Sequence, residues 1–377
     1  MTARFKRLII GFVVLVVAYL PVPGAAQDLS PNSRAAALID VKTGRILYQK
    51  NADEQLPMAS TTKIMTAVTA IEEGDLQDTV TASIRAQNAG GSSIYLQAGE
   101  RLKLEELLYG LMLQSGNDAA VAIAEHIGKS CEGFASMMNS KAARIGAASS
   151  NFVNPHGLDA EGHYTTAGDL AKITAYALNN LVFKEVVSTK QRKIPWWGRN
   201  YSRVLNNKNK ILWQVEGGDG VKTGFTNRAG RCLVASATRD GYQLASVVLN
   251  CGPMWEESAA LLEYGFNTYK PVTFYEEGQF VKTIAVKKGK DERVRLVADR
   301  SVMIPLTEQE QQRVEVVEEC QDILTAPVLE GQVAGHIKFA LDGEVLMQAH
   351  LVCQQEVKEK SIKSVIPEIL RSLINPR

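Results

Sequence analysis

The segment GRCLVASATRDGYQLASVVLN, residues 230–250, sets the fold class of this chain. It contains two β-rich runs, at 230–238 and 242–250, and the dipeptide Asp240-Gly241 lies between them. An Asp-Gly pair flanked by apolar runs is a strong signal for a two-residue turn between antiparallel strands. The sequence therefore predicts a β-hairpin over residues 230–250.

Residues 35–48 predict two more strands, because apolar runs flank the turn residues Lys42-Thr43-Gly44. Strands at both ends of a domain, with helices between them, indicate one antiparallel sheet packed against a helical cluster, which is an α+β fold. The chain termini of this domain are then expected to meet within the sheet. Apolar residues recur at helical spacing from Pro57 or Ser60 to Glu73 and in the segments 102–114, 118–127, 169–178 and 256–264.

After residue 270 the helical signals nearly stop. We predict a first domain over residues 27–270 and a small all-β domain over residues 271–355. No residue cluster in the second domain indicates catalysis, so we interpret it as a spacer or packing module. Its expected strands are short apolar or alternating segments at 281–286, 294–297, 314–317, 333–339 and 344–352.

The first residues have the pattern of an export signal. Three basic residues precede an apolar run at 8–20, which is shorter than the roughly 20 residues that a membrane-spanning helix needs. Small and helix-breaking residues follow, so residues 1–26 are predicted to be a cleaved signal peptide. An uncleaved anchor is the alternative. Either signal places the rest of the chain at the extracytoplasmic face of the bacterial cytoplasmic membrane.

Residues 356–377 are predicted to form an amphipathic C-terminal helix. Apolar residues from Ile362 to Ile374 keep the spacing of one helical stripe, and basic residues lie elsewhere on the helix. This pattern fits a helix that lies in a membrane surface, and we interpret it as a membrane anchor. A helix packed on its own domain or on a second subunit would have the same pattern, and Pro367 would kink it in each case.

The charge balance argues against nucleic acid as a partner, and the cysteine pattern argues against a bound metal ion. Lys plus Arg total 42 and Asp plus Glu total 41, so no net field recruits nucleic acid. The five cysteines are an odd number, and none has the Cys-x-x-Cys or histidine spacing of a metal site. We therefore expect free buried thiols, no metal and no cofactor. The sequence does not indicate an oligomeric state.

The strongest chemical signal is Ser60-Thr61-Thr62-Lys63. Residues three apart share one face of a helix, so Lys63 can reach the Ser60 hydroxyl and take its proton. A serine becomes a good nucleophile only when a base activates it, and a buried amine near other cations can remain neutral and act as that base. An ordinary helix start with a solvated lysine is the alternative interpretation of this stretch alone.

Two further motifs follow in the order known for serine penicillin-interactive enzymes. They are Ser115-Gly116-Asn117 and Lys222-Thr223-Gly224. Chance copies also occur, because Lys42-Thr43-Gly44 repeats the second motif and residues 30–32 and 149–151 repeat the first. Only Ser115 follows a predicted helix, and only Lys222 lies after the Ser-x-x-Lys sequence, so we take these two copies as functional.

The text around the motifs resembles the low-molecular-mass penicillin-binding proteins, the serine-type D-alanyl-D-alanine carboxypeptidase family. The resemblance covers residues 35–269. It implies a β-lactamase/transpeptidase-like fold, peptidoglycan stem peptides as substrates and covalent binding of β-lactam antibiotics. The blocks that carry it are PMASTTK (57–63), SGNDAA (115–120), NPHGLD (154–159) and DGVKTGFT (219–226).

The resemblance also implies catalytic roles. Ser60 would attack the terminal D-Ala-D-Ala bond and form an acyl-enzyme, with Lys63 as its base. Ser115 would relay a proton to the departing D-alanine, and Asn117 would bind the substrate backbone or orient Lys63. The loss of D-alanine from pentapeptides would limit cross-linking.

Substrate recognition is assigned in the same way. Lys222 would supply a positive charge and, with Thr223, bind the terminal carboxylate of the substrate. Gly224 would leave room for the peptide to lie along the strand as an added β-strand. The backbone N–H groups of Ser60 and Phe225 would form the oxyanion hole.

Other activities share parts of this pattern. A D,D-endopeptidase needs the same residues, and a penicillin-sensing module would keep the same fold. A β-lactamase commonly uses a Glu-x-x-x-Asn segment, which does not occur between the second and third motifs. His156 and the other histidines lack the pattern of a Ser-His-Asp triad, so His156 is interpreted as shaping a loop. The chain differs from the family pattern at two places. Lys208 stands where arginine is common, and the segment 252–255 lies where some relatives carry an arginine.

Overall fold

The structure is a computed structural model that describes residue 29 and residues 32–360. The predicted signal peptide at 1–26 and the apolar stripe of the C-terminal helix lie outside the described residues. The predicted start of that helix was wrong, because residues 356–360 are not helical and Val357 and Glu359 form β-bridges with Val328 and Gly289. The described residues contain two hydrophobic cores. The first is built from residues between Ala35 and Leu249, and the second from residues between Ile284 and Val357.

A five-stranded antiparallel sheet forms the frame of the first core. The first strand, β1, pairs with β9, so the two ends of this domain meet within the sheet, as predicted. The turn residues Asp240 and Gly241 both have positive φ, at 49° and 78°, as a two-residue hairpin of this type requires. The sheet order is β2 (Ile46–Lys50), β1 (Ala35–Asp40), β9 (Tyr242–Leu249), β8 (Gly230–Arg239) and β7 (Gly218–Thr226).

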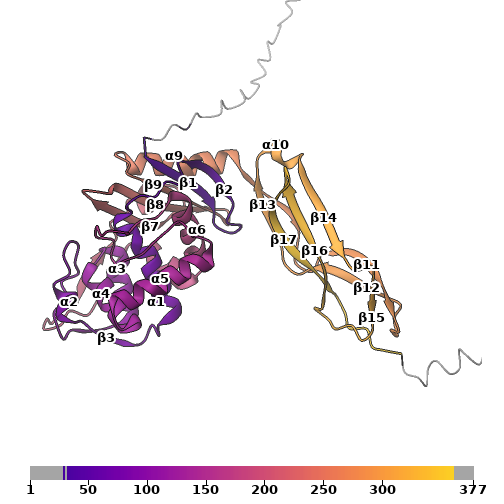
Figure 1. Cartoon of the computed structure of the whole chain (residues 1–377), viewed down its shortest axis with the longest axis horizontal. Helices are drawn as coiled ribbons and strands as arrows, with labels where there is room; N and C mark the ends of the chain where they lie inside the picture. The colour runs from indigo at the N-terminus through magenta and orange to yellow at the C-terminus, as the bar shows by residue number, and fades with distance from the viewer. Residues whose placement is uncertain (1–28, 30–31, 361–377) are drawn as a thin grey trace, which may run out of the picture. The chain divides into compact units, whose positions relative to one another are not determined.

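Helices cover both faces of this sheet (Figure 1). The closing helix α9 (Met254–Thr268) packs on the face that carries Leu38 and Leu244, because a Cβ at Gly265 would lie 2.5–2.7 Å from these two side chains. The opposite face carries Ala37, Ile39 and Val247, which belong to the first hydrophobic core. The other helices of the domain supply the rest of that core, which confirms the predicted α+β arrangement.

The helical cluster begins with a short 3-10 turn, Ala59–Thr62, that leads directly into α1. The helix predicted at 102–114 begins two residues later, because Leu102 and Lys103 belong to a short strand. The helix α5 (Cys131–Ile145) was not predicted, since the buried Lys141, paired with Glu72 and Glu73, interrupts its apolar stripe. The remaining helices are α1 (Lys63–Glu73), α2 (Ile84–Gln87), α3 (Leu104–Leu113), α4 (Asn117–Gly128), α6 (Ala167–Leu178), α7 (Leu181–Ser188) and α8 (Ile211–Gln214).

Two small hairpin-like pairs flank this cluster. The strand β3 (Thr79–Thr81) pairs with β4 (Arg101–Lys103), and β5 (Gln191–Ile194) pairs with β6 (Arg203–Asn206). These pairs were not predicted, because each strand is only three or four residues long, which is too short for its alternation to stand out in the sequence. They hold the loops on either side of α3.

The second core lies in a β-rich region, as predicted. All five expected strands are present within β11, β12, β14, β16 and β17, and β10, β13 and β15 are additional. The two-stranded sheet pairs β10 (Lys270–Tyr275) with β13 (Val302–Leu306). The six-stranded sheet has the order β14 (Val314–Cys320), β16 (Val333–Leu341), β17 (Glu344–Cys353), β12 (Arg293–Ala298), β11 (Phe280–Lys287) and β15 (Ile323–Thr325), and a short helix α10 covers Glu308–Gln311.

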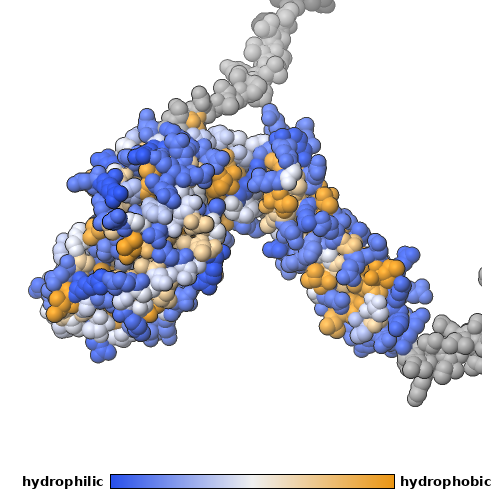
Figure 2. Space-filling model, in the orientation of Figure 1, coloured by the Kyte–Doolittle hydropathy of each residue, from blue (hydrophilic) through white to orange (hydrophobic). Residues whose placement is uncertain are grey.

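The five cysteines are free, and four of them are buried, which agrees with the expected free thiols. Within residues 32–360 no group of three or more His, Cys, Asp or Glu side chains is arranged to hold a metal ion. No helix in the described part of the chain has the length and apolarity to cross a membrane. On the face drawn in Figure 2, apolar residues form small separate groups among hydrophilic ones, as is normal for a domain surface in contact with water.

Candidate active site

The predicted nucleophile and base lie where the 3-10 turn passes into α1. Ser60 is in the turn and Lys63 is the first residue of the helix, so their side chains share one face. The Lys63 Nζ lies 3.0 Å from the Ser60 Oγ. It also donates to the Asn117 Oδ1 at 2.7 Å and to the His156 backbone oxygen at 2.6 Å. The structure therefore brings together residues from the first two motifs.

These contacts fit a neutral lysine amine. Such an amine has two N–H donors and one lone pair. The amide nitrogen of Asn117 donates to the Gly90 oxygen at 2.5 Å, so its Oδ1 faces Lys63 as an acceptor. The backbone oxygen of His156 is also only an acceptor. Both N–H groups of Lys63 are then used, and its lone pair is left for the hydroxyl proton of Ser60.

The surroundings of Lys63 favour this uncharged form. The side chain is fully buried, and burial is the main cause that holds the pKa of Lys63 well below its ordinary value. The charge of Lys222 lowers this pKa further, and the carboxylate of Asp118 opposes the shift. A lysine in this environment can accept a proton near neutral pH.

The third motif lies on β7, at the edge of the five-stranded sheet. A Cβ built on Gly224 would lie only 3.0 Å from the Ser60 backbone nitrogen, so the two backbones approach closely and a side chain at 224 would enter this space. Phe225 is the next residue, and its side chain is 63% exposed. The Ser60 backbone nitrogen and the start of the Gly224-Phe225 segment are thus neighbours.

Lys222 is buried beside these groups, and its Nζ donates to the Thr223 backbone oxygen at 2.9 Å. Burial, with a smaller contribution from Lys208, lowers the pKa of Lys222 to about 7. Lys222 is therefore only partly charged at neutral pH in the free protein. A carboxylate placed next to it would favour its charged form.

Ser115 lies in the connection between α3 and α4 and is buried. Its φ is 62°, a conformation that non-glycine residues seldom adopt. Strained backbone of this kind is often found at functional sites. Two residues later, Asn117 opens α4 and contacts Lys63, so the turn at Ser115 places the second motif next to the first.

Comparisons with known proteins identify the family of this chain. A family model described as D-alanyl-D-alanine carboxypeptidase, peptidase S11, matches residues 23–252. The chain belongs to the peptidase S11 family. It is a serine-type D-alanyl-D-alanine carboxypeptidase of peptidoglycan and a low-molecular-mass penicillin-binding protein. A second model, the C-terminal domain of penicillin-binding protein 5, matches residues 269–359.

Two relatives of this S11 peptidase are similar over most of their length. It is 34% identical over 377 residues to D-alanyl-D-alanine carboxypeptidase DacF of Bacillus subtilis, covering 95% of each chain. It is 35% identical over 349 residues to DacC of Escherichia coli, covering 88% of this chain and 85% of the relative. The solved structure of penicillin-binding protein 5 from Haemophilus influenzae superposes with a TM-score of 0.73 at 31% identity, covering 88% of this chain and 99% of the other.

The site of this S11 peptidase contains two groups to which the sequence assigned no role in the site. The first is the backbone oxygen of His156, which accepts from Lys63. The next residue, Gly157, has φ of 87°, and a Cβ there would lie 1.9 Å from the Ala59 oxygen, so only glycine fits. Burial lowers the pKa of His156 to about 3, which keeps its ring neutral. The expectation that His156 shapes a loop agrees with these contacts.

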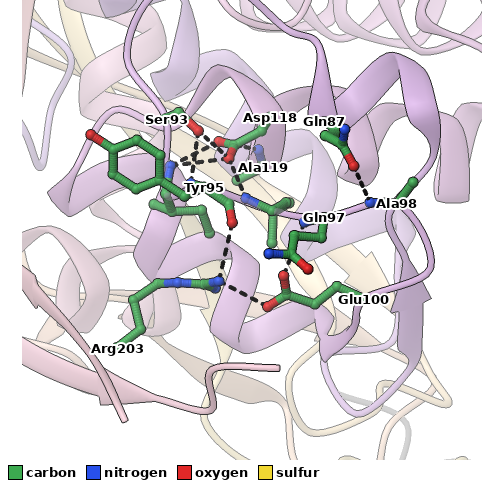
Figure 3. Close-up of polar contacts among 11 residues, drawn as sticks. Gln87, Ser93, Tyr95, Gln97, Ala98, Glu100, Asp118, Ala119 and Arg203 are labelled. Atoms are coloured by element: carbon green, nitrogen blue, oxygen red, sulfur yellow. Dashed lines mark hydrogen bonds and ion pairs between the residues drawn. The ribbon is translucent and has the colours of Figure 1, made fainter. Parts of the chain in front are cut away.

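The second missed residue is Asp118, which is fully buried in the first turn of α4. Its carboxylate accepts hydrogen bonds at 2.5–3.1 Å from the Ser93 hydroxyl and from the backbone nitrogens of Ile94 and Leu96 (Figure 3). It also accepts from the Ala119 nitrogen at 2.9 Å. Asp118 thus ties the loop before α3 to the second motif. Its position in the quoted SGNDAA block was the only sequence signal for this role.

Replacement of Asp118 by asparagine is expected to destabilise the protein. The variant Asp118→Asn turns an amide group toward backbone N–H donors, and we expect the free energy of unfolding to fall by about 2–3 kcal/mol. Denaturant unfolding measures this change. The matched control is Asp53→Asn at an exposed position, which should stay within about 0.5 kcal/mol of the original protein. Equal stability of the two variants would contradict the anchoring role.

The two departures from the family pattern also have defined places. Lys208 is exposed, and its Nζ donates to the Gln114 backbone oxygen at 3.3 Å, just before Ser115. It lies close enough to Lys222 to lower the pKa of that residue. In the segment 252–255, Pro253 precedes α9, and the Gly252 oxygen accepts from the Arg231 side chain at 3.5 Å. A cation is therefore present at each place where the chain differs from the family pattern: Lys208 itself, and Arg231 beside Gly252.

Proposed function

We propose that this carboxypeptidase removes the terminal D-alanine from stem pentapeptides through an acyl-enzyme on Ser60. The observation that carries the proposal is the position of the Lys63 amine, which contacts the Ser60 hydroxyl while two acceptors occupy its N–H groups. This arrangement gives the serine a base without a histidine. The same nucleophile would open β-lactam rings and retain the antibiotic covalently.

In the acylation step, the Ser60 Oγ bonds to the carbonyl carbon of the penultimate D-alanine, and its proton passes to Lys63. The amide C–N bond then breaks. The proton moves from Lys63 through the Ser115 hydroxyl to the leaving nitrogen, so D-alanine departs as a neutral amine. Water attacks the ester in a second step, with Lys63 again accepting a proton, and restores the free serine.

Other groups bind the negative charge that develops on the carbonyl oxygen and the terminal carboxylate of the substrate. The backbone N–H groups of Ser60 and Phe225 form the oxyanion hole in this proposal, and each such donor contributes about 3 kcal/mol to transition-state stabilisation. Lys222 and Thr223 bind the terminal carboxylate. The peptide lies against β7 as an added strand, which the close approach of Gly224 to the Ser60 backbone supports.

The alternatives predict different products. A D,D-endopeptidase would use the same residues on cross-links. A β-lactamase would need fast deacylation, for which the sequence lacks the usual Glu-x-x-x-Asn segment. A penicillin-sensing module would acylate without turnover. The match to the D-alanyl-D-alanine carboxypeptidase family supports an enzyme that turns over.

We place the enzyme outside the cytoplasm. The proposed signal peptide at residues 1–26 exports it, and the proposed amphipathic helix, whose apolar stripe runs from Ile362 to Ile374, binds the outer surface of the cytoplasmic membrane. The catalytic domain then spans residues 27–270, and the β-rich domain begins at residue 271 and includes the bridged residues Val357 and Glu359. Removal of D-alanine at this location reduces the supply of pentapeptide donors for cross-linking.

The test is a product assay on defined substrates. The purified protein should release D-alanine from diacetyl-Lys-D-Ala-D-Ala and be labelled by fluorescent penicillin. Faster release of monomers from a cross-linked muropeptide dimer than of D-alanine from the pentapeptide would favour the endopeptidase. Labelling without release of any product would refute the proposed hydrolysis and favour the sensor.

A further inference from the structure

Exposed aromatic rings gather where the β5–β6 hairpin meets the loop before α3. Trp197 is 51% exposed and Tyr201 is 56% exposed, and both lie in the turn between the two strands. Tyr95, in the loop, is 73% exposed. Together with Trp196, these three residues form what we call the aromatic hairpin surface. Large exposed rings are costly in water and often mark a binding surface.

The rings of this surface are held in place. The centroids of Trp196 and Tyr201 lie 5.7 Å apart in an edge-to-face arrangement. The buried Arg203 places its guanidinium 5.1 Å from the centre of the Trp196 ring. Trp197 lies against the backbone of Gly99, where a Cβ would be 3.5 Å from the indole. A fixed ring loses little entropy when a ligand stacks on it.

This surface is joined to the candidate active site by hydrogen bonds. Arg203 donates to the Tyr95 oxygen at 3.4 Å and to the buried Glu100 at 2.9 Å (Figure 3). The same loop contacts the second motif, because the Asn117 nitrogen donates to the Ser92 oxygen at 2.7 Å. The far end of β6 is also tied to this motif, since Gln114 donates to the Asn206 oxygen at 2.9 Å. The aromatic hairpin surface is therefore linked, through the loop that carries Ser92 and Tyr95, to the second motif of the candidate active site.

The backbone of Tyr95 adds to this picture. Its φ is 64°, which is unusual for a bulky residue and costs conformational energy. Asp118 holds the neighbouring residues and Arg203 holds the Tyr95 carbonyl, so the surrounding contacts maintain the strain. Such strain is commonly retained where it serves recognition. Its result here is an aromatic side chain kept in solvent.

We propose that the aromatic hairpin surface binds the glycan strand to which the stem peptide is attached, an inference that rests on the proposed function. The C–H faces of sugar rings stack on aromatic rings, and the exposed Arg199 and Asn200 beside Trp197 can hydrogen-bond sugar hydroxyl and acetamido groups. A five-residue peptide spans at most about 18 Å, so the saccharide stays near the mouth of the cleft.

A membrane surface is the competing occupant, and the turn argues against it. Its tip is Gly198-Arg199-Asn200, and all three residues are exposed and none is apolar. A segment that enters a bilayer interface instead places apolar residues at its deepest point. The mixture of rings and polar groups fits a hydrated saccharide.

The test compares two substrates in the full-length protein. One is diacetyl-Lys-D-Ala-D-Ala, and the other is an uncross-linked glycan strand that carries pentapeptides. We expect the ratio of kcat/KM for the strand to kcat/KM for the tripeptide to fall about tenfold in Trp197→Ala and in Tyr201→Ala. The matched control is Phe280→Ala in the β-rich region, where Arg295 lies 4.5 Å from the centre of a 45% exposed ring. This control should leave the ratio unchanged.

A second measurement is independent of catalysis. Glycan strands stripped of their peptides should co-sediment with the original protein and with Phe280→Ala, and less with Trp197→Ala and Tyr201→Ala. Unchanged sedimentation and an unchanged ratio in both variants would overturn the glycan site. So would loss of binding to phospholipid vesicles in Trp197→Ala while the ratio stays constant. If neither substrate is hydrolysed but strand binding depends on Trp197, the proposed reaction fails and the glycan site stands.

Discussion

Ser60→Ala is expected to abolish both covalent labelling by fluorescent penicillin and the release of D-alanine, with a loss of activity of about 10⁴-fold or more. The alanine has no oxygen to form the acyl ester, and Ser60 supplies the hydroxyl that lies 3.0 Å from the Lys63 amine. Gel fluorescence measures the labelling, and an assay for D-alanine measures turnover. Unchanged thermal unfolding would show that the variant is folded.

The matched control for this change is Ser149→Ala. Ser149 begins another Ser-x-Asn sequence, but it is exposed and lies in the turn after α5. We expect this variant to keep its labelling and turnover. Labelling that persists in Ser60→Ala would displace Ser60 as the nucleophile.

The second large effect is expected at Lys63. Lys63→Arg keeps a long nitrogen-bearing side chain, but a guanidinium does not lose its proton in proteins and so cannot serve as a base. We expect the rate of penicillin acylation to fall by about 10²–10⁴-fold. Stopped-flow or time-resolved labelling measures this rate. A variant that acylates at the original rate would exclude Lys63 as the base.

The same residue predicts a pH dependence with a definite sign. Acylation by the original protein should slow as the pH falls through the lowered pKa of Lys63, because the protonated amine has no lone pair. The folded chain also holds this proton less well than the unfolded chain, in which lysine titrates near 10.5. Below the folded pKa of Lys63, this difference in proton binding therefore lowers the free energy of unfolding. The loss becomes smaller as the pH rises from the folded pKa toward 10.5. Lys63→Met should lack this part of the stability profile.

Much of the fold followed from local patterns. The Asp240-Gly241 turn predicted the β8–β9 hairpin because the two positive φ values of such a turn suit few residue pairs. The periodicity of α1, α4 and α6 was also sufficient to predict them. The helix α5 was missed because Lys141 is buried against Glu72 and Glu73 from another helix, and no local pattern reveals that pairing.

The candidate site also contains some residues that the sequence predicted and others that it did not. The Ser60–Lys63 pair is set by helical spacing, and motif order separated Lys222 from the chance copy at Lys42, which the structure places in the β1–β2 turn. The acceptor at His156 is a backbone oxygen, which every residue carries, so residue type could not point to it. Asp118 was quoted in a motif block, but its partners Ser93 and Leu96 lie more than twenty residues away.

The residue types and their spacing were thus sufficient to establish the sheet hairpins, the serine and lysine on one helical face, and the family resemblance. They did not establish the protonation of Lys63, the loop held by Asp118, or the aromatic hairpin surface. A hydrogen bond within one helix turn depends on neighbours that the sequence displays. Burial and the proximity of Lys222 and Asp118 depend on distant segments, and these set the charge of the amine.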